Sequence, residues 1–341
     1  MTAGLRRPTL ADVARQAGVS LKTASRALND EPHVRSATAS RVRSAADDLG
    51  FRPNRLAQGL RSGASLGSIG LVIGDVGNPF WSAAARGIER QLPGADLVLV
   101  TASHEEDPGL QERLVRTLVE RRVDGLVLVP APGTTDLTPL LRGVPVVALD
   151  RPLPAPAVDE VVFDDRSAAT TAVLALLAQG HQRVAFVGAE ADLWTVRERL
   201  AGYREALTRA DVSSDEALVR LNCPDAARAA TALRELLRLP DAPTAVLAMN
   251  NLVCRGVLRA ACDAGVPLEV TAFDPDPDAD LFARTPSTVV NDPETAGRVA
   301  AGLLLDRLQG DRRPPRRLVL PATLVVRSSA ALLPDHAWRH P

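Results

Sequence analysis

The spacing of apolar residues changes between residues 50 and 68 of the chain. Before Gly50, apolar side chains recur every three or four positions in short segments, which is the period of amphipathic helices. From Ser68 onward, short continuous runs of Val, Ile and Leu alternate with longer segments of helical period. Because such strands joined by helices form a parallel sheet covered on both faces, the pattern predicts a small helical head followed by a large α/β body.

The first two helices of the head are short and close together in the sequence. Thr9, with Asp12 three residues later, fits a capping box, and Gly18 ends the first helix. Ser20 then caps a second helix over Leu21–Leu28, whose outward face combines short polar and long cationic side chains. This arrangement is typical of a helix-turn-helix unit, in which the second helix enters the major groove of DNA. The alternative is a helical hairpin inside a larger core.

A third helix is expected from Ser36 to Leu49, with Gly50 closing it. The segment 52–62 follows, and its Pro53 suits the first turn of a helix. Gly59 costs about 1 kcal/mol in such a helix relative to alanine, and so short a helix is marginal alone. On its residues alone, this segment is either a helix that needs a partner or a flexible linker.

The charge of the chain is unevenly distributed. Residues 1–62 hold eleven Lys and Arg against five Asp and Glu, a net charge of +6. The remaining residues hold 29 basic and 36 acidic side chains, a net charge of −7, so the overall charge of −1 hides the asymmetry. A basic head on an acidic body predicts a polyanionic partner at the head.

The body divides into two successive α/β units. In the first unit, strands are expected at Ile69–Ile73, Leu97–Thr101, Gly125–Val129 and Val144–Leu149, and helices at Phe80–Leu92 and Gly109–Arg121. In the second unit, strands are expected at Arg183–Gly188, Ala217–Leu221, Ala245–Ala248 and Glu269–Ala272, and helices at Ser167–Gln179, Thr195–Ala210, Pro224–Leu239 and Asn251–Ala264. Open parallel sheets bind ligands beyond the carboxyl ends of their strands, where polar residues of this chain cluster.

A series of motifs connects these segments to a known family. In chain order they are TLADVARQAGVS, TASRALN, GFRPN, LAQGL, IGLVI with NPF, RRVDGLVL, PVVALDR, RERLAGY and LVLPATLVVR. Together they resemble the LacI/GalR family of bacterial transcription regulators, in the family's order and over nearly the whole chain.

The resemblance implies a domain plan. Residues 1–62 would form a helix-turn-helix DNA-binding domain with a hinge helix at 52–62. Residues 63–341 would form an effector-binding and dimerisation domain, a two-lobed doubly wound α/β fold like the type I periplasmic binding proteins. Lobe 1 would comprise about residues 67–162 and 293–327 and lobe 2 about 163–292, joined by three crossovers, with Glu294–Gln309 and Leu324–Arg327 completing lobe 1.

The resemblance also assigns DNA contacts residue by residue. Leu21 and Lys22 match a pair that reads base edges, and Arg26 lies beside them. The expected phosphate-binding residues are Thr9, Ser20, Thr23, Ser25 and Asn29, and Asn54 is a further expected DNA contact. Leu60 matches the hinge leucine that wedges into the minor groove, where such a side chain kinks the duplex. The implied partner is a pseudo-palindromic operator bound by a homodimer or a higher oligomer.

Ten positions match family residues that touch the effector or lie beside it. They are Asp75, Asn78, Phe80, Asp150, Phe163, Asp164, Arg199, Asn250, Asp274 and Asn291. Carboxylates, amides and an arginine around aromatic rings suit a polyhydroxylated ligand, a sugar or related polyol, because Asp and Asn bind hydroxyls in pairs. Asn251 and Pro275 stand where the family usually has Asp, which leaves the identity of the ligand open. Trp194 either caps the pocket or packs.

Other functional classes fit the sequence less well. A periplasmic binding protein would share the lobes but carry a signal peptide, and a sugar kinase or hydrolase would show a phosphate loop or nucleophile elbow. No apolar run approaches the roughly 18 residues of a membrane span. The run from Asp274 to Asp280 alternates aspartates as a calcium loop does, but lacks the glycine and glutamate that such a loop needs. His104 to Asp107 reads as an acidic helix start.

We therefore expect a ligand-controlled DNA-binding repressor and not an enzyme. The three cysteines, Cys223, Cys254 and Cys262, match no zinc motif and indicate buried thiols in a reducing cytoplasm. Neither a metal nor a cofactor is expected, and the partners are operator DNA, a small effector and a second copy of the chain. Both inducer and corepressor action fit this plan.

Overall fold

The structure is a computed structural model that describes residues 8–29, 32, 34–51, 67–95, 97–278 and 285–327. The chain divides into two compact units, Met1–Leu66 and Gly67–Pro341. The expected hinge segment 52–62, with Asn54 and Leu60, lies outside the described residues.

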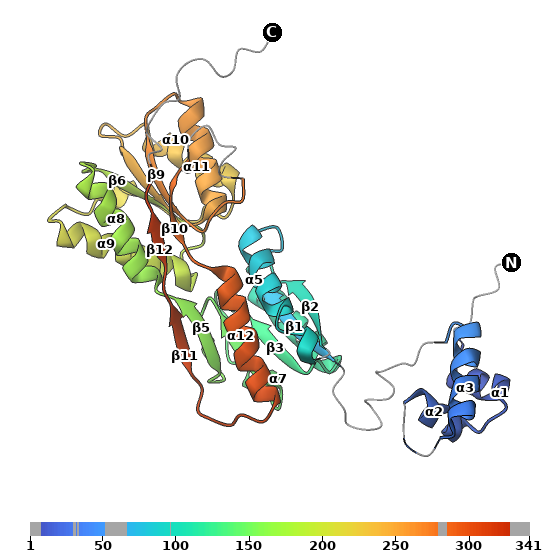
Figure 1. Cartoon of the computed structure of the whole chain (residues 1–341). Helices are drawn as coiled ribbons and strands as arrows, with labels where there is room; N and C mark the ends of the chain where they lie inside the picture. Colours follow the sequence, from blue (N-terminus) through green and yellow to red (C-terminus); the bar gives the residue numbers. More distant parts are fainter. Residues whose placement is uncertain are drawn as a thin grey trace, which may run out of the picture. The chain divides into compact units, whose positions relative to one another are not determined.

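The head contains the three expected helices, α1 (Leu10–Gln16), α2 (Leu21–Leu28) and α3 (Ser36–Asp48) (Figure 1). Both halves of the capping box are present, because Thr9 accepts from the Asp12 backbone while the Asp12 side chain accepts from Thr9. The Ser20 hydroxyl accepts from the Thr23 backbone N–H at 3.1 Å and so caps α2. Val13, Ala24 and Val42, one from each helix, are fully buried and form the centre of the core.

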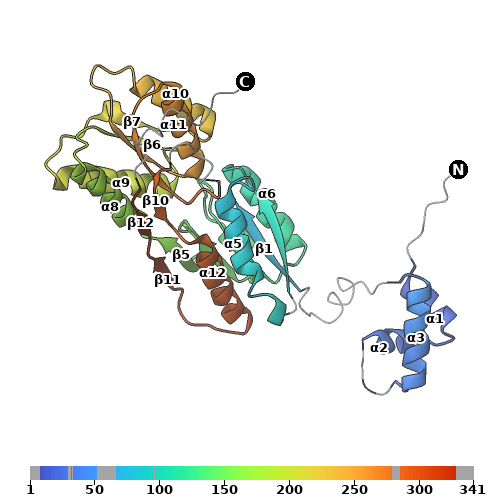
Figure 2. The same ribbon diagram turned by 45° about the horizontal axis from the view of Figure 1, so that its top comes forward.

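The first sheet of the body, which defines lobe 1, has the strand order β11-β5-β4-β3-β1-β2 with all strands parallel. Its strands are β1 (Ser68–Ile73), β2 (Val98–Ser103), β3 (Gly125–Leu128), β4 (Val146–Leu149), β5 (Asp159–Phe163) and β11 (Arg317–Leu320). Its helices are α5 (Pro79–Glu89), α6 (Pro108–Glu120), α7 (Thr138–Leu141) and α12 (Pro293–Leu308). Helices α5 and α12 lie side by side in both ribbon views (Figure 1, Figure 2) and pack on Ile69 and Leu71, while α6 and α7 cover the opposite face through Val72.

The second sheet, which defines lobe 2, has the order β12-β10-β9-β8-β6-β7. Its strands are β6 (Val184–Val187), β7 (Val219–Arg220), β8 (Ala245–Ala248), β9 (Glu269–Phe273), β10 (Ser287–Val290) and β12 (Thr323–Val325). Helices α8 (Asp165–Ala178) and α9 (Trp194–Arg209) cover one face with Phe186, and α10 (Ala226–Leu236) and α11 (Asn251–Asp263) cover the other with Val187. The body is therefore two doubly wound α/β lobes.

The chain crosses between the lobes three times, after β5, after β10 and between β11 and β12. The expectation that Leu324–Arg327 completes lobe 1 is wrong, because β12 pairs antiparallel with β10 of lobe 2, with Thr288 opposite Val325. Only β11 returns to the first sheet, where Leu318 lies opposite Val161. The short segment between β11 and β12 contains Pro321, which cannot donate to a sheet ladder and marks the change of sheet.

Candidate functional site

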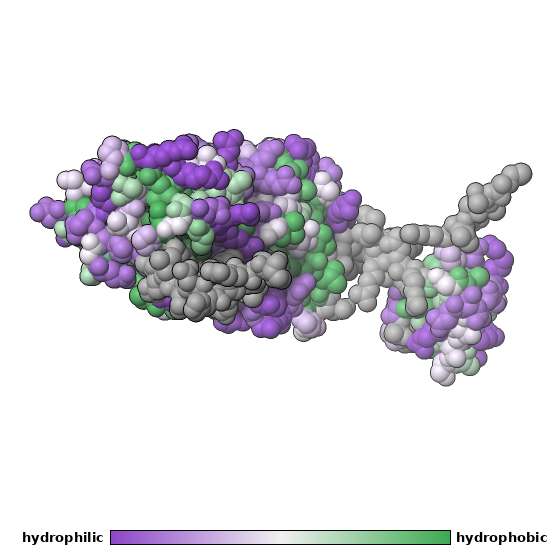
Figure 3. Space-filling model, turned by 90° about the horizontal axis from the view of Figure 1, so that it is seen from above, coloured by the Kyte–Doolittle hydropathy of each residue, from purple (hydrophilic) through white to green (hydrophobic). Residues whose placement is uncertain are grey.

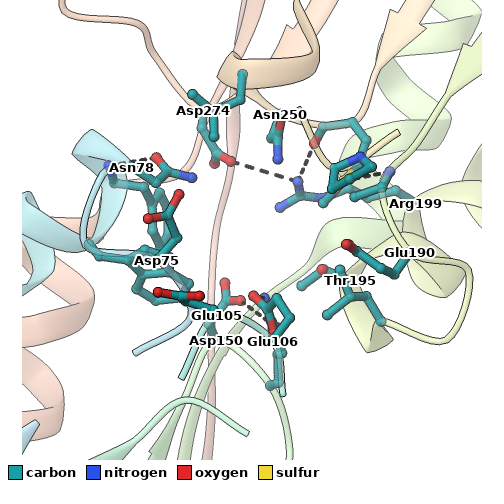
Figure 4. Close-up of a pocket in the computed structure, with 18 residues that line it drawn as sticks. Asp75, Asn78, Glu105, Glu106, Asp150, Glu190, Thr195, Arg199, Asn250 and Asp274 are labelled. Atoms are coloured by element: carbon teal, nitrogen blue, oxygen red, sulfur yellow. Dashed lines mark hydrogen bonds and ion pairs between the residues drawn. The ribbon is translucent and has the colours of Figure 1, made fainter. Parts of the chain in front are cut away.

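A cavity of about 370 Å³ lies between the two lobes and takes its wall from both. Seven of the ten expected effector residues line it: Asp75, Asn78, Phe80, Asp150, Arg199, Asn250 and Asp274 (Figure 4). Most of them directly follow a strand or begin the helix after it, since Asp75 comes after β1, Asp150 after β4 and Asp274 after β9. The cavity is thus where parallel sheets place ligands, at the carboxyl edges of their strands.

Asp150 and Asp274 occupy equivalent places in the two lobes. Each directly follows the last residue of its strand and has a left-handed backbone conformation, with φ of 67° for Asp150 and 63° for Asp274. Each backbone N–H donates to the neighbouring strand, to Val161 O at 2.7 Å and to Val289 O at 3.0 Å respectively. Aspartate tolerates this conformation better than most residues, and the turn aims both carboxylates at the cavity.

Arg199 is held in the wall by buried acids. Its Nε donates to Asp165 Oδ1 at 2.8 Å. Its Nη1 donates to the Met249 carbonyl and lies 3.7 Å from Asp274 Oδ2. The guanidinium carbon stands 4.0 Å from the centroid of the Phe273 ring, a cation–π arrangement. Asp165 has a fully buried side chain behind the wall, so it fixes the guanidinium from the side away from the cavity.

Two amides serve both a helix and the cavity. Asn78 caps α5 by accepting from the Phe80 N–H at 3.0 Å, and Asn250 caps α11 by accepting from the Val253 N–H at 2.8 Å. Asn78 Oδ1 also accepts from Asn251 Nδ2 at 3.2 Å, a hydrogen bond that joins lobe 1 to lobe 2. Asn251, which stands where the family usually has Asp, therefore lies at the interface between the lobes.

The sequence interpretation missed an acidic part of the wall formed by Glu105, Glu106 and Glu190. Glu105 and Glu106 were expected to form an acidic helix start, but only Asp107 does so, capping α6 through the N–H groups of Gly109 and Leu110. The two glutamates follow β2 and line the cavity, so the strand-end rule that identified Asp75 could have found them.

Glu106 has a partner that was also missed, Arg151, which lines the cavity next to Asp150. The two side chains form a bidentate ion pair with distances of 2.5 and 2.9 Å, and Arg151 also donates to Pro130 O at 3.1 Å. Gly74 makes room for this pair, because a Cβ there would lie 2.3 Å from Glu106 Oε1.

Three of the expected effector residues do not line the cavity. Phe163 is 2% exposed in the core of lobe 1, where its ring centroid lies 6.1 Å from that of Phe80. Asp164 caps α8 by accepting from the Ser167 N–H at 3.3 Å. Asn291 is fully buried beside Asp165, where burial raises the pKa of the Asp165 carboxyl and Asn291 partly opposes that shift. Phe163 ends β5, and Asp164 and Asn291 directly follow β5 and β10, so all three lie at crossovers between the lobes. Their side chains pack in the core or cap a helix and do not line the cavity. Trp194, which the sequence left open, lines a neighbouring cavity.

Burial dominates the electrostatics of the cavity. It raises the pKa of Asp150 to about 7, although Arg151 beside it lowers that pKa. It raises the pKa of Asp274 to about 6 against the opposing effect of Arg199. Burial also raises the pKa of Glu190. The cavity therefore penalises additional negative charge.

The head presents a second candidate site on α2. Lys22 and Arg26 are exposed on this helix, Leu21 is 53% exposed, and Thr23 and Ser25 are partly exposed. Ser20 and Asn29 are the exposed cap residues at its two ends, and Thr9 caps α1. A large apolar side chain on an otherwise polar helix face suits contact with the edge of a base, such as a thymine methyl group.

Two negative findings limit the possible sites. Among the described residues, no helix is long and apolar enough to cross a membrane, and hydrophilic residues make up much of the surface in Figure 3. Within the same residues, no three His, Cys, Asp or Glu side chains converge as a metal site would require.

Comparisons with known proteins cover both units. The model for bacterial regulatory proteins of the lacI family matches residues 9–54, and the model for periplasmic binding proteins and the sugar binding domain of the LacI family matches residues 66–327. The regulator CelR of Thermobifida fusca is 36% identical over 340 residues, covering 95% of this chain and 98% of CelR. The regulator GalR of Escherichia coli K12 is 31% identical over 344 residues, covering 97% of this chain and 98% of GalR.

Solved structures agree in fold. A CelR–cellobiose complex has a TM-score of 0.70 at 33% identity and covers 95% of this chain and 100% of its own. A lac repressor dimer bound to operator and the anti-inducer ONPF has a TM-score of 0.82 at 26% identity and covers 95% of this chain and 99% of its own.

Proposed function

The chain belongs to the LacI family of bacterial regulatory proteins, and from that premise we propose that it is a repressor controlled by a polyhydroxylated ligand in the cleft. It is a DNA-binding transcriptional regulator, and we infer that it acts in the cytoplasm, where its operator lies. The observation that carries the proposal is one polar cavity built from strand ends of both lobes. A ligand that touches both lobes binds one lobe arrangement more tightly than another and so shifts their populations.

On the DNA side, α2 is the recognition helix. Leu21, Lys22 and Arg26 read base edges, and the hydroxyl and amide side chains around them bind phosphates, namely Thr9, Ser20, Thr23, Ser25 and Asn29. Asn54 and Leu60 add contacts from the hinge segment. One head covers a half-site, so a two-fold homodimer binds a pseudo-palindrome. The related lac repressor is described as a dimer bound to operator.

On the ligand side, the chemistry of the wall favours a carbohydrate. Asp75, Asp150 and Asp274 supply acceptors for paired hydroxyls, Asn78 and Asn250 supply amides, and Phe80 supplies an apolar ring. Related regulators are described with cellobiose and, at 27% identity, with ribose. The lobes of this chain close on the sugar, and closure changes the spacing of the two hinge segments in the dimer.

The test is operator affinity measured by fluorescence anisotropy, with and without candidate sugars, on the full-length dimer. We expect one sugar class to change the affinity by about tenfold or more, the range of ordinary allosteric coupling. Asn250→Ala should weaken that response and leave sugar-free operator binding unchanged. Sugars that bind the cleft without altering operator affinity would overturn the proposed coupling.

A further inference from the structure

The wall of the cleft carries far more negative than positive charge. Six carboxylates line it, from Asp75, Glu105, Glu106, Asp150, Glu190 and Asp274, against the two guanidinium groups of Arg151 and Arg199. Figure 4 shows these carboxylates on several sides of the cavity, from elements of both lobes. A neutral sugar needs hydroxyl acceptors, but it does not need a formal excess of four negative charges around it.

Neither arginine is available to balance the excess, because each already has its own acid. Arg151 binds Glu106 in bidentate fashion, and its Nε lies 3.4 Å from Asp150 Oδ2. Arg199 binds Asp165, which is not part of the wall, and lies 3.7 Å from Asp274 Oδ2. In the part of the chain that the structure describes, Asp75, Glu105 and Glu190 form no ion pair. The negative charges of these three carboxylates are therefore not compensated by side chains of the described residues.

Backbone dipoles reduce the excess without removing it. Helices α5, α9 and α11 begin at the cavity, since Asn78, Thr195 and Asn250 line it. Each helix N-terminus supplies about half a positive charge, so three supply roughly 1.5 charges against four. In addition, Asp274 is 7% exposed and its Oδ1 has no hydrogen-bond partner among the described residues. A buried carboxylate oxygen without a partner is costly, which points to a donor that arrives with the ligand.

A metal ion does not fit this charge distribution. The described residues hold no group of three His, Cys, Asp or Glu side chains placed to bind one metal ion together. The carboxylates instead surround a cavity of about 370 Å³, which is the size of an organic ligand. An organic cation matches both the charge and the space.

We propose, on the basis of the ligand-binding function above, that the effector is an amino sugar with a free, protonated amine. An ammonium group offers three donors to the carboxylates around it, and charge-assisted hydrogen bonds are about twice as strong as neutral ones. The remaining hydroxyls bind as in any sugar. Phosphorylated sugars and sugar acids are excluded, because like charges placed together cost several kcal/mol.

The experiment compares matched sugars by isothermal titration calorimetry on the full-length protein. The pairs are glucose with glucosamine, galactose with galactosamine, and cellobiose with its fully deacetylated diamino counterpart, chitobiose. Each amine is also tested as its neutral N-acetyl derivative, and glucose 6-phosphate is the anionic probe. We expect an amine to bind at least about tenfold more tightly than its hydroxyl and N-acetyl counterparts, a difference of about 1.4 kcal/mol. Raising NaCl from about 0.05 to 0.5 M should reduce the difference.

Substitutions of single glutamates test which wall residues cause the preference for the amine. Glu190→Gln and Glu105→Gln keep the size of the side chain and remove one uncompensated charge each, so each should reduce the preference for the amine several-fold. The exposed Glu120→Gln at the end of α6 is the matched control and should leave the preference unchanged.

Each outcome bears on the inference. A neutral sugar that binds as tightly as its amine, with a response at the operator, would overturn the inference and leave the proposed function standing. If no compound in any form altered operator affinity, the carbohydrate class of the proposed function would fall together with the inference. An amine preference that persists in both glutamate variants would also contradict it.

Discussion

Four acidic residues of the cleft wall have left-handed backbone conformations, which residues other than glycine rarely adopt. Glu105, Glu106, Asp150 and Asp274 have φ values of 51°, 58°, 67° and 63°. A residue held in this region costs on the order of 1 kcal/mol or more, and such strain persists where surrounding structure imposes it. For Asp150 and Asp274, hydrogen bonds to Val161 and Val289 of the adjacent strands hold this conformation. The cleft is therefore built at a cost in stability, in strain as well as in buried charge.

The buried acid Asp150 makes stability depend on pH. Its pKa is about 7 in the folded protein, above the value of about 3.9 in an unfolded chain. Between those values the folded state keeps a proton that the unfolded state has lost, so the free energy of unfolding falls as pH rises from about 4 to 7. Asp150→Asn removes this term and should stabilise the ligand-free protein at pH 8 by up to about 4 kcal/mol, at about 1.4 kcal/mol per pKa unit.

Urea unfolding at pH 5, 6, 7 and 8 measures this effect, with Glu120→Gln as the exposed control. The difference between Asp150→Asn and the wild-type protein should grow with pH and level off above about 7. A difference that stays constant across the range would show that Asp150 is not protonated by burial.

The ligand response is best tested at Asp274. Arg199→Ala is a weaker probe, because it leaves Asp165 buried without its partner, at a cost of about 3–5 kcal/mol. Asp274→Asn keeps the shape and a hydrogen-bonding side chain, so the fold and ligand-free operator affinity should be preserved while ligand affinity falls about tenfold or more. Calorimetry and operator binding on the same preparation check this. Full ligand affinity in Asp274→Asn would remove Asp274 from the site.

At the scale of elements, the packing of α5 on α12 depends on two glycines. A Cβ on Gly87 would lie 2.0 Å from Glu294 O, and a Cβ on Gly297 would lie 2.1 Å from Ala84 O. The backbones of the two helices can approach this closely only without side chains there. This contact fixes α5, whose first residues carry Asn78 and Phe80 into the cleft.

Gly297→Ala should therefore destabilise the body by about 1–3 kcal/mol, the usual cost of overpacking. Gly302 provides a control on the same helix, because a Cβ there meets nothing within 4 Å. Gly302→Ala should be neutral or stabilise by up to about 1 kcal/mol through helix propensity. Equal effects of the two substitutions in urea unfolding would contradict the assigned packing.

The helix α2 carries the prediction for DNA. Arg26→Ala should relax operator preference at one position of the half-site by about 1–3 kcal/mol, the value of one bidentate base contact. The exposed Arg41 on α3 is the control, and Arg41→Ala should leave the preference intact. Competition between operator variants at fixed salt measures it. Unchanged preference in Arg26→Ala would show that α2 is docked differently.

The sequence predicted the elements that have one clear pattern and missed those decided by tertiary contacts. Continuous apolar runs identified β1, β3, β8 and β9, and cap residues identified α1 and α2. Strand β5 was missed because Asp159 and Glu160 interrupt its apolar run, and Arg307 binds Asp159 only in the folded protein. The sheet that β12 joins depends on the free edge of β10, which no local pattern encodes.

In the candidate site too, residues with a clear local pattern were predicted and residues placed by tertiary structure were missed. Residues of the family motifs line the cleft as predicted, including Asp150 and Asp274 at strand ends and Arg199 on α9. Glu105 and Glu106 were interpreted as part of a helix start, because local sequence does not reveal the left-handed turn that aims them at the cavity. The excess charge of the cleft, which depends on them, could not have been deduced from the motifs alone.

At the scale of the whole molecule, the proposed function requires two copies of the chain. A single head covers one half-site, so affinity for a full operator depends on a dimer. We expect a dimer in sedimentation equilibrium at micromolar concentration, and Leu60→Ala should lose up to a few kcal/mol of operator affinity without losing ligand affinity. A monomer that binds the full operator with undiminished affinity would contradict this plan.

The most direct test of whether the cleft controls DNA binding is operator affinity with and without effector, for the wild-type protein and for Asp274→Asn. Fluorescence anisotropy at fixed salt gives both values on the same labelled operator. Ligand should change the operator affinity of the wild-type protein about tenfold or more. Asp274→Asn should bind operator equally well without ligand and should no longer respond at the same ligand concentration. An Asp274→Asn protein that still responds at the same ligand concentration as the wild type would contradict the claim that the cleft controls the head.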